Sequence, residues 1–304
     1  MNLQRPTPDS QVSASHPRRA SMPVRFGFFL IALLILTGCA APPPLDSTPA
    51  APVVEAPPLP TPTRYPTQTP HPSPTLTPAE PAPLAVTQIC SPLEGLALGD
   101  LREIISNPFD LPRPGFDDRH HGVDFAFYRY RGRIGMLGLP VYAAIPGVVA
   151  AALSDSNPYG NALIIETPLE DFPPEWLAAI GVPTPAPTQA PVAPLACPEL
   201  PPPGWDNNRR SLYTLYAHLQ YPTGFQPGDQ ITCGQQIGEV GTTGRSVNEH
   251  LHFETRVGPA AARFTSMAHY DNTASEEERS NYCIWRISGA FQMFDPMQLL
   301  NFRP

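Results

Sequence analysis

The chain has 304 residues, enough for one good-sized domain or two small ones. Its formal net charge of -8 provides no basic surface of the kind that binds nucleic acid, so that class of partner is excluded. Prolines number 44, and 16 of them lie between residues 42 and 83, a region that lacks the apolar periodicity needed for a core.

An apolar stretch that ends at Leu36 is the first element in chain order. It is too short for a comfortable transmembrane helix but suits the core of a signal peptide. The sequence "LTGC" at its end resembles a bacterial lipobox, which implies cleavage before Cys39 and lipidation of its thiol. Residues 1–38 are therefore predicted to be a lipoprotein signal peptide, with an uncleaved signal anchor as the alternative and Met1 or Met22 as the start. In either case, the rest of the chain is expected outside the cytoplasmic membrane.

Residues 39–87 are predicted to be a lipid-anchored, disordered linker rich in proline and threonine. In the extended polyproline II conformation, which rises about 3.1 Å per residue, some 45 residues reach roughly 140 Å. The linker would therefore let a folded domain reach well away from its membrane anchor.

Four cysteines remain after Cys39, which is consistent with an exported protein. Four cysteines can pair in three ways, and we expect Cys197 to pair with Cys233 and Cys90 with Cys283. The alternative is that they stay reduced and partly buried. No CxxC spacing occurs, so a zinc cluster of cysteines is not expected.

Residues 88–304 are predicted to form one all-β domain, a compact antiparallel sheet or sandwich with long loop insertions. Short apolar runs alternate with turn residues in "LPVYAAIPGVVAAAL", "YGNALIIET", "SLYTLYAHLQ" and "PGDQITCGQQIGEVG". In the third run, strand alternation places Leu212, Thr214, Tyr216 and His218 on one face. Only "PEWLAAIG" and "DPMQLLNF" are expected to be helical. A proline-rich stretch at about 170–208 is interpreted as a surface insertion.

Five histidines fall in three short clusters, "DRHHGVDFAF", "YAHL" and "NEHLHFE". In the last, His250 and His252 alternate with apolar residues, so on a strand both imidazoles point to the same face. Such a pair indicates a metal site, catalysis or coincidence. His269 lies in a polar loop and is expected to be solvated.

His120 and Asp124 in the first cluster are four residues apart. On a straight strand their Cα atoms would be about 13 Å apart, too far for both side chains to bind one ion. The chain must therefore bend between them if they share a metal, and Gly122 is where it can. The alternative is a histidine–aspartate hydrogen bond on a turn, without a metal.

Two histidines and a carboxylate form a three-ligand zinc site that leaves a fourth position for water. Zinc lowers the pKa of that water to about 7, and a nearby imidazole can then accept or return a proton. Spacing alone does not decide whether His250 or His252 is the ligand.

The order of "HHGVD", "YAHL" and "HLH" resembles that of the lysostaphin-type (LytM-like) zinc endopeptidases. "VYAAIPGVV", "NPYGNALII", "GQQIGEVGTTGRS" and "HLHFE" match the same family, and the resemblance covers roughly residues 91–256. It implies a LytM-type domain with one Zn²⁺ ion.

By this resemblance, His120, Asp124 and His252 bind the zinc, and His218 and His250 are the catalytic imidazoles. One of the two imidazoles would act as general base, and the other would steady the oxyanion and help to protonate the leaving amine. The family pattern selects His120 of the histidine pair, so its neighbour His121 is expected to point away.

Other residues near these motifs carry weaker expectations. Glu254 shares a strand face with His250 and His252, and it either orients an imidazole or has a structural role. The segment before His120 lacks the tyrosine that some family members have there. The proline-rich insertion and the loop 258–289 would narrow the groove if they flank it.

The leading functional prediction is a lipid-tethered zinc endopeptidase that cleaves peptide bonds in peptidoglycan stems or cross-bridges. It would act at the outer face of the cytoplasmic membrane or elsewhere in the envelope. The alternative is a non-catalytic LytM-type regulator or cell-wall-binding module. A zinc-binding surface module without hydrolytic activity is a third possibility.

Overall fold

The computed structural model describes residues 84–113, 115–183, 197–198 and 204–303. The predicted signal peptide, Cys39, most of the predicted linker and much of the proline-rich insertion lie outside these residues. The elements, in chain order, are η1 (Asp100–Ile104), β1 (Ile105–Asn107), β2 (Val123–Phe125), β3 (Arg129–Tyr130), β4 (Arg133–Ile134), β5 (Pro140–Tyr142), β6 (Gly147–Ser156), β7 (Gly160–Pro168), η2 (Leu169–Asp171), α1 (Pro174–Ile180), β8 (Asp206–Leu219), β9 (Gln230–Ile231), β10 (Gln236–Glu239), β11 (Leu251–Ala260), α2 (Glu276–Arg286), β12 (Gln292–Phe294) and α3 (Pro296–Leu300).

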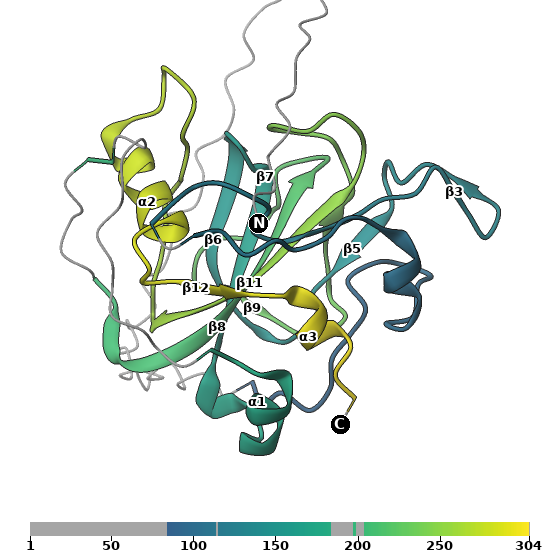
Figure 1. Cartoon of the computed structure of the whole chain (residues 1–304), viewed down its shortest axis with the longest axis horizontal. Helices are drawn as coiled ribbons and strands as arrows, with labels where there is room; N and C mark the ends of the chain where they lie inside the picture. Colours follow the sequence, from purple (N-terminus) through teal and green to yellow (C-terminus); the bar gives the residue numbers. More distant parts are fainter. Residues whose placement is uncertain (1–83, 114, 184–196, 199–203, 304) are drawn as a thin grey trace, which may run out of the picture. The chain divides into compact units, whose positions relative to one another are not determined.

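Eight strands of the described part form one sheet in the order β1-β2-β11-β8-β7-β6-β9, with β12 paired to β11. Figure 1 labels the long strands β6, β7, β8 and β11 of this sheet. Every strand pair in this sheet is antiparallel. Two small antiparallel pairs, β5 with β10 and β3 with β4, lie apart from it. The predicted fold class, a compact antiparallel β domain with long insertions, is therefore confirmed.

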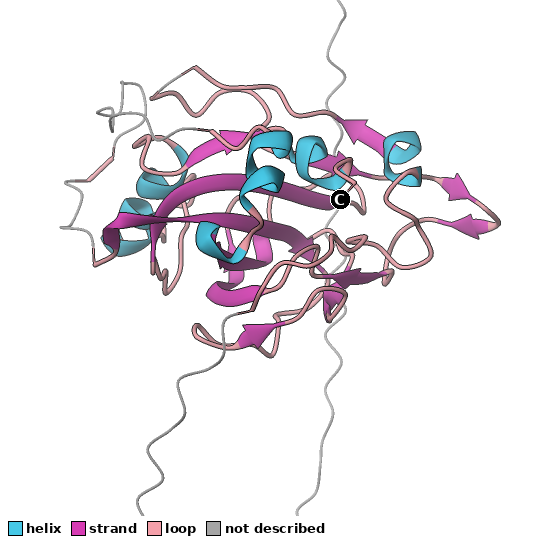
Figure 2. Ribbon diagram, turned by 90° about the horizontal axis from the view of Figure 1, so that it is seen from below, coloured by secondary structure: helices cyan, strands magenta, loops and turns pink. Residues whose placement is uncertain are grey.

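The central strands are buried on both faces. Along β7, Leu163 and Ile165 pack into one apolar cluster, whereas Ala162 and Ile164 pack into another, because successive side chains point to opposite faces. Residues from the segment before β6 fill the first cluster, and the helix α2 closes the second. Figure 2 shows the long strands running through the centre of this part, with helices outside them. Burial on both sides explains why these strands appear in the sequence as nearly continuous apolar runs.

The two predicted helices are present as α1 and α3, but α2 is an additional helix that the sequence analysis did not anticipate. It begins with a capping box in which the Ser275 hydroxyl accepts from the Glu278 amide and the Glu278 carboxylate accepts from the Ser275 amide. Its Tyr282, Cys283 and Trp285 are buried. Among the helices of the described residues, none combines the length and the apolar character needed to span a bilayer.

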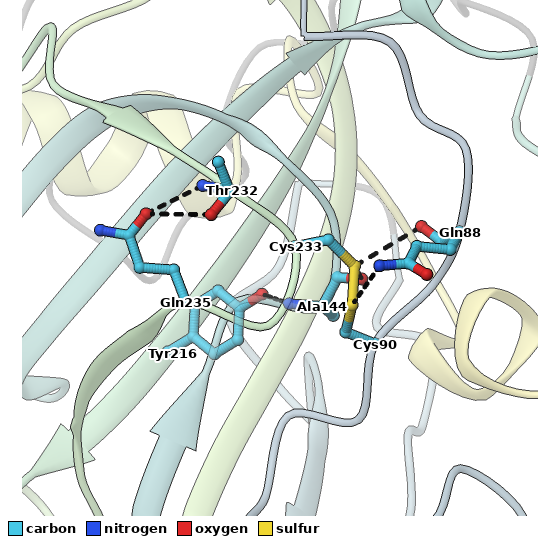
Figure 3. Close-up of a disulfide and its surroundings, with 7 residues drawn as sticks. All are labelled: Gln88, Cys90, Ala144, Tyr216, Thr232, Cys233 and Gln235. Atoms are coloured by element: carbon cyan, nitrogen blue, oxygen red, sulfur yellow. Dashed lines mark hydrogen bonds between the residues drawn. A yellow bond between two sulfur atoms is a disulfide. The ribbon is translucent and has the colours of Figure 1, made fainter.

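The expected disulfide pairing is wrong. Cys90 pairs with Cys233, and Cys197 pairs with Cys283, with Cα–Cα distances of 5.8 and 5.9 Å. The first bond forms where two segments meet at Ala144, whose carbonyl accepts from the Cys90 amide at 2.8 Å and lies 3.3 Å from the Cys233 sulfur (Figure 3). The second bond joins the proline-rich insertion to α2, and because that helix was not anticipated, neither was this pairing.

Removing the Cys90–Cys233 bond is expected to destabilise the fold. The bond closes a sequence separation of 143 residues, so it restricts the unfolded chain strongly. The double replacement Cys90→Ser/Cys233→Ser should lower the free energy of unfolding by about 2–4 kcal/mol in guanidinium titrations. Wild-type protein measured with and without reductant provides the control. A double variant as stable as the oxidised wild type would contradict this expectation.

Candidate metal centre

Three neighbouring strands bring the predicted site residues together. His252 on β11 is paired in register with Asp124 on β2, and His120 lies in the bend that precedes β2. On the other side of β11, His218 lies near the end of β8, and His250 directly precedes β11. Residues separated by up to 132 positions therefore meet where β8 ends and β11 begins.

The donor atoms of His120, Asp124 and His252 face one another. Asp124 Oδ1 lies 2.7 Å from His252 Nδ1 and 3.1 Å from His120 Nε2, and the two nitrogens are 3.2 Å apart. All three donor atoms lie within 4.8 Å of one another, so one cation can contact them all. Two imidazoles and a carboxylate are a donor set that suits zinc.

Gly122 makes this convergence possible. A Cβ at this position would lie 2.4 Å from the Phe253 carbonyl oxygen and 2.9 Å from Cε1 of His252. Only glycine therefore lets the segment between His120 and Asp124 approach β11 so closely. The chain turns before β2 begins, as the ligand spacing requires. Gly122 allows this segment to lie directly against β11.

Each of the two histidines has its remaining nitrogen held by a hydrogen bond. His120 Nδ1 lies 2.9 Å from the Pro108 carbonyl oxygen, and His252 Nε2 lies 3.1 Å from Glu254 Oε1. A proton on each of these nitrogens leaves the opposite nitrogen with its lone pair facing the donor cluster. Although burial disfavours the charged form, hydrogen bonds to Asp124 and Glu254 raise the pKa of His252 to about 9. Although burial opposes ionisation, the two histidines hold the pKa of Asp124 well below its ordinary value.

His218 and His250 form a second imidazole pair beside the donor cluster, with ring centroids 4.6 Å apart. His218 Nδ1 lies 2.8 Å from the Thr243 carbonyl oxygen, and His250 Nδ1 lies 2.9 Å from that of Asn248. Both rings therefore keep Nε2 available, and His250 Nε2 lies 3.6 Å from Asp124 Oδ1. Burial, together with the neighbouring histidines, lowers the pKa of His218 to about 3, so its imidazole is neutral at physiological pH.

His218 does not share a face with Tyr216, contrary to the expected alternation along this strand. Tyr216 packs in the cluster on one side of the sheet, whereas the ring of His218 contacts that of His252 on the other side, at 5.8 Å between centroids. The pairing of β7 with β8 shifts register between Asn161 and Leu163, and His218 has a left-handed φ of 60°. This local irregularity turns the imidazole toward the site, a use of β-bulges that is common beside active sites.

Glu254 is the centre of a buried network behind His252. Its Oε1 accepts from the Tyr159 hydroxyl at 2.9 Å, and its Oε2 accepts from Arg256 Nε at 2.8 Å and from Trp285 Nε1 at 3.2 Å. Although burial opposes ionisation, Arg256 and His252 hold the pKa of Glu254 well below its ordinary value. The contacts support both roles considered for this residue, because the ionised carboxylate orients His252 and also ties α2 to the sheet.

Asp117 forms a second connection between α2 and the site. Its carboxylate accepts from Arg286 Nε at 2.7 Å, from the Tyr282 hydroxyl at 2.6 Å and from the Tyr270 hydroxyl at 2.5 Å. Sequence reasoning missed Asp117 and the residues of α2. Two signals were available: Asp117 lies three residues before His120, and a capping box marks the start of α2.

His121 points away from the donor cluster, into the same buried network. Its Nδ1 lies 3.0 Å from an Arg256 nitrogen, and its Nε2 lies 3.1 Å from the Asp118 carbonyl oxygen. His269, expected to be solvated, is half-buried instead, and its ring stacks on Tyr282 at 5.1 Å between centroids.

A cavity of about 640 Å³ opens over the donor cluster. The loop 258–289 does flank this cavity, since Tyr270, Tyr282 and Arg286 line it. The Tyr270 side chain reaches the site from this loop, whereas the segment before His120 supplies no tyrosine. An insertion therefore builds one wall of the candidate site.

Acid is expected to destabilise the fold through His121 and His218. Burial depresses the pKa of both imidazoles far below the ordinary value of about 6.5, which applies to the unfolded chain. The stabilising contribution is complete above about pH 6.5. As the pH falls toward about 4, it decreases by about 1.4 kcal/mol per unit and per histidine, because only the unfolded state takes up these protons. Urea titrations of chelator-treated protein at several pH values measure this slope.

His121→Gln is the matched control for that slope. In this variant, unfolding should take up one proton fewer, so the slope of the unfolding free energy against pH should be smaller by the contribution of one histidine. Glutamine keeps polar atoms at this position but does not titrate. An unchanged slope in this variant would contradict the assignment of the proton uptake to His121.

Two histidines and an aspartate on an antiparallel sheet, with two further imidazoles beside them, have the chemistry that a metal-dependent hydrolase requires. Residues 206–263 match the model of Peptidase family M23, a segment that contains His218, His250 and His252. The match to this family model, together with the candidate metal site at His120, Asp124 and His252, bears out the predicted enzyme class, a zinc metallopeptidase.

Solved structures provide further similarities. A zinc-containing peptidase from Vibrio cholerae is 23% identical over 50% of this chain, with a TM-score of 0.29, and the match spans only 32% of the Vibrio chain. The catalytic domain of lysostaphin from Staphylococcus simulans is 20% identical over 68% of this chain and 98% of its own, with a TM-score of 0.32. A catalytic-domain mutant of the M23 protein EnpA from Enterococcus faecalis is 21% identical over 53% of this chain and 84% of its own, with a TM-score of 0.30. Comparison with curated proteins gave no match.

Proposed function

We propose that residues 88–304 form a zinc-dependent endopeptidase domain that hydrolyses peptide bonds in peptidoglycan stems or cross-bridges. The observation that carries this proposal is the convergence of all five predicted site residues at one cavity. His120, Asp124 and His252 offer a three-ligand site, and His218 and His250 lie beside it with Nε2 free. A regulator or binding module needs no such second pair of imidazoles.

His120, Asp124 and His252 would hold the metal, and the imidazole pair moves protons. A zinc ion bound between His120, Asp124 and His252 would polarise a substrate carbonyl and supply a water of lowered pKa. His218 and His250 each donate Nδ1–H to a backbone carbonyl, so each presents a basic Nε2 to the cavity. One imidazole accepts the proton of the attacking water at Nε2 and, once protonated, can donate it to the leaving amine. The other, when protonated, stabilises the oxyanion.

The location follows from the chain's N-terminal segments. Residues 1–38 would direct export, Cys39 would carry the lipid anchor, and residues 39–87 would tether the domain to the outer face of the membrane. Both disulfides of the described part fit an oxidising compartment outside the cytoplasm. Mass spectrometry of the membrane-bound chain should find an acylated Cys39 as its N-terminal residue. An intact N-terminal segment without acylation of Cys39 would contradict the lipid anchor.

Digestion of cell-wall sacculi tests the activity directly. The full-length chain, purified in detergent and loaded with zinc, should release soluble peptides from sacculi, chelator should stop the release, and added zinc should restore it. Sacculi of several chemotypes are needed, because loops at the groove select the bond. If the zinc-loaded chain releases nothing from any of them, the endopeptidase proposal fails and the non-catalytic alternative is favoured.

A further inference from the structure

Three arginines line the cavity, and two of them already have an acidic partner. Arg119 pairs with Asp110 at 3.0 Å, and Arg286 pairs with Asp117 at 2.7 Å. The third, Arg245, has no carboxylate within ion-pair distance among the residues that the structure describes. Its guanidinium is therefore available to a group that enters the cavity.

The backbone that carries Arg245 is held in place. The Arg245 amide donates to the Pro158 carbonyl at 2.8 Å. The preceding Gly244 has a φ of +71°, and a Cβ there would lie 2.3 Å from the Gly160 amide nitrogen, so the two loops touch through backbone alone. The guanidinium carbon lies 5.9 Å from the centroid of the Tyr270 ring, an arrangement that favours a cation over the aromatic face.

This same loop contacts both imidazoles of the proposed proton-transfer pair. The Thr243 carbonyl accepts from His218 Nδ1 at 2.8 Å, and the Ser246 hydroxyl lies 3.3 Å from His250 Nδ1. Arg245 lies between these two contact residues. A substrate group bound by the Arg245 side chain would therefore lie close to the peptide bond at which the two imidazoles transfer protons.

The charges around the cavity favour an anion at this position. Asp117 and Asp124 are the two carboxylates among the lining residues, and both are occupied, by Arg286 and by the histidine ligands. Among the described side chains that line the cavity, Arg245 is thus the ionised group without an ionic partner, although the chain as a whole carries -8. A guanidinium binds a carboxylate through two parallel hydrogen bonds, which a neutral amide cannot reproduce.

We propose that Arg245 binds a free carboxylate of the peptide substrate and thereby selects peptides in which that carboxylate lies near the scissile bond. This inference rests on the proposed endopeptidase function and specifies its substrate class. An unsubstituted carboxylate of a stem peptide has the required chemistry, whereas the same peptide with that group amidated should be a poor substrate.

The test uses synthetic peptidoglycan stem peptides and derivatives in which each free carboxylate is singly converted to a carboxamide. With the zinc-loaded full chain, one of these amidations should lower kcat/KM by roughly 10- to 100-fold, the range expected when a charge-assisted hydrogen bond is lost. Arg245→Gln should cleave the free and the amidated peptide equally slowly. Arg245→Lys should retain part of the preference, and added salt should weaken it.

Arg129→Gln is the matched control, because Arg129 is an exposed arginine on β3 and does not line the cavity. This variant should keep the wild-type preference. The inference is overturned if no amidation affects the wild type, or if Arg245→Gln keeps the wild-type preference.

Binding measurements distinguish failure of this inference from failure of the proposed endopeptidase function. If the zinc-loaded wild type cleaves none of these peptides, calorimetric titration of the same pairs still decides the inference. Tighter binding of the free carboxylate by the wild type, lost in Arg245→Gln, supports the anion site without hydrolysis. Equal affinities for the free and amidated peptides, or no measurable binding, overturn it.

Discussion

His250→Ala should lower kcat/KM for a peptidoglycan peptide by roughly 10²- to 10⁴-fold while the protein still binds one zinc per chain. The physical reason is that His250 lies outside the three-donor cluster and is held by Asn248 through Nδ1, which leaves Nε2 for the proposed proton transfer. Hydrolysis assays and metal analysis on the same preparation separate these two effects. His218→Ala should behave in the same way.

The control for these two variants is His269→Gln, which changes a histidine that does not line the cavity. Its activity should stay within a few-fold of the wild type, because the half-buried His269 contacts Tyr282 but faces neither the donor cluster nor the imidazole pair. An active His250→Ala variant would remove this residue from the mechanism, and loss of zinc from the variant would make His250 a ligand.

Glu254→Gln should weaken zinc binding by roughly 10- to 100-fold, the usual effect of removing the carboxylate behind a histidine ligand. The wild-type carboxylate accepts from His252 Nε2 at 3.1 Å, which fixes the proton on that nitrogen and leaves Nδ1 for the metal. The change should also cost about 3–5 kcal/mol of stability, because the buried Arg256 loses its ionised partner. Zinc titration against a competing chelator and urea unfolding in chelator measure the two effects.

Glu166→Gln is the matched control for the second prediction. Glu166 is another buried carboxylate with an arginine partner, Arg263, and it accepts from Ser211 at 2.8 Å. This variant should lose stability but keep the zinc affinity of the wild type. If Glu254→Gln also keeps that affinity, Glu254 is structural and does not position His252.

The sheet follows from local patterns in the sequence, whereas the choice of His120, Asp124 and His252 as ligands rests on the family resemblance. Much of β6, β7 and β8 is buried on both faces, so these strands contain clear apolar runs, whereas β11 is buried but alternates apolar and polar residues. His250, His252 and Glu254 share a face because alternation holds through β11. The spacing of His120 and Asp124 demanded a bend, and the structure has one directly before β2.

Other features depend on tertiary contacts that local patterns do not specify. The helix α2 is polar on much of its surface, and only its capping box indicated where it begins. The disulfide pairs depend on where α2 lies and on which segments meet at Ala144. His218 reaches the site because a register shift and a left-handed φ turn it around, and simple alternation predicts the opposite face.

The central claim is that His120, Asp124 and His252 together hold a single zinc ion. Metal analysis of the zinc-loaded full chain, alongside His120→Ala and Asp124→Ala, tests it most directly. We expect one zinc per chain in the wild type and a large loss of zinc in both variants, with each variant's secondary structure checked by circular dichroism. A wild type without zinc under replete conditions, or folded variants that keep their full zinc content, would contradict the claim.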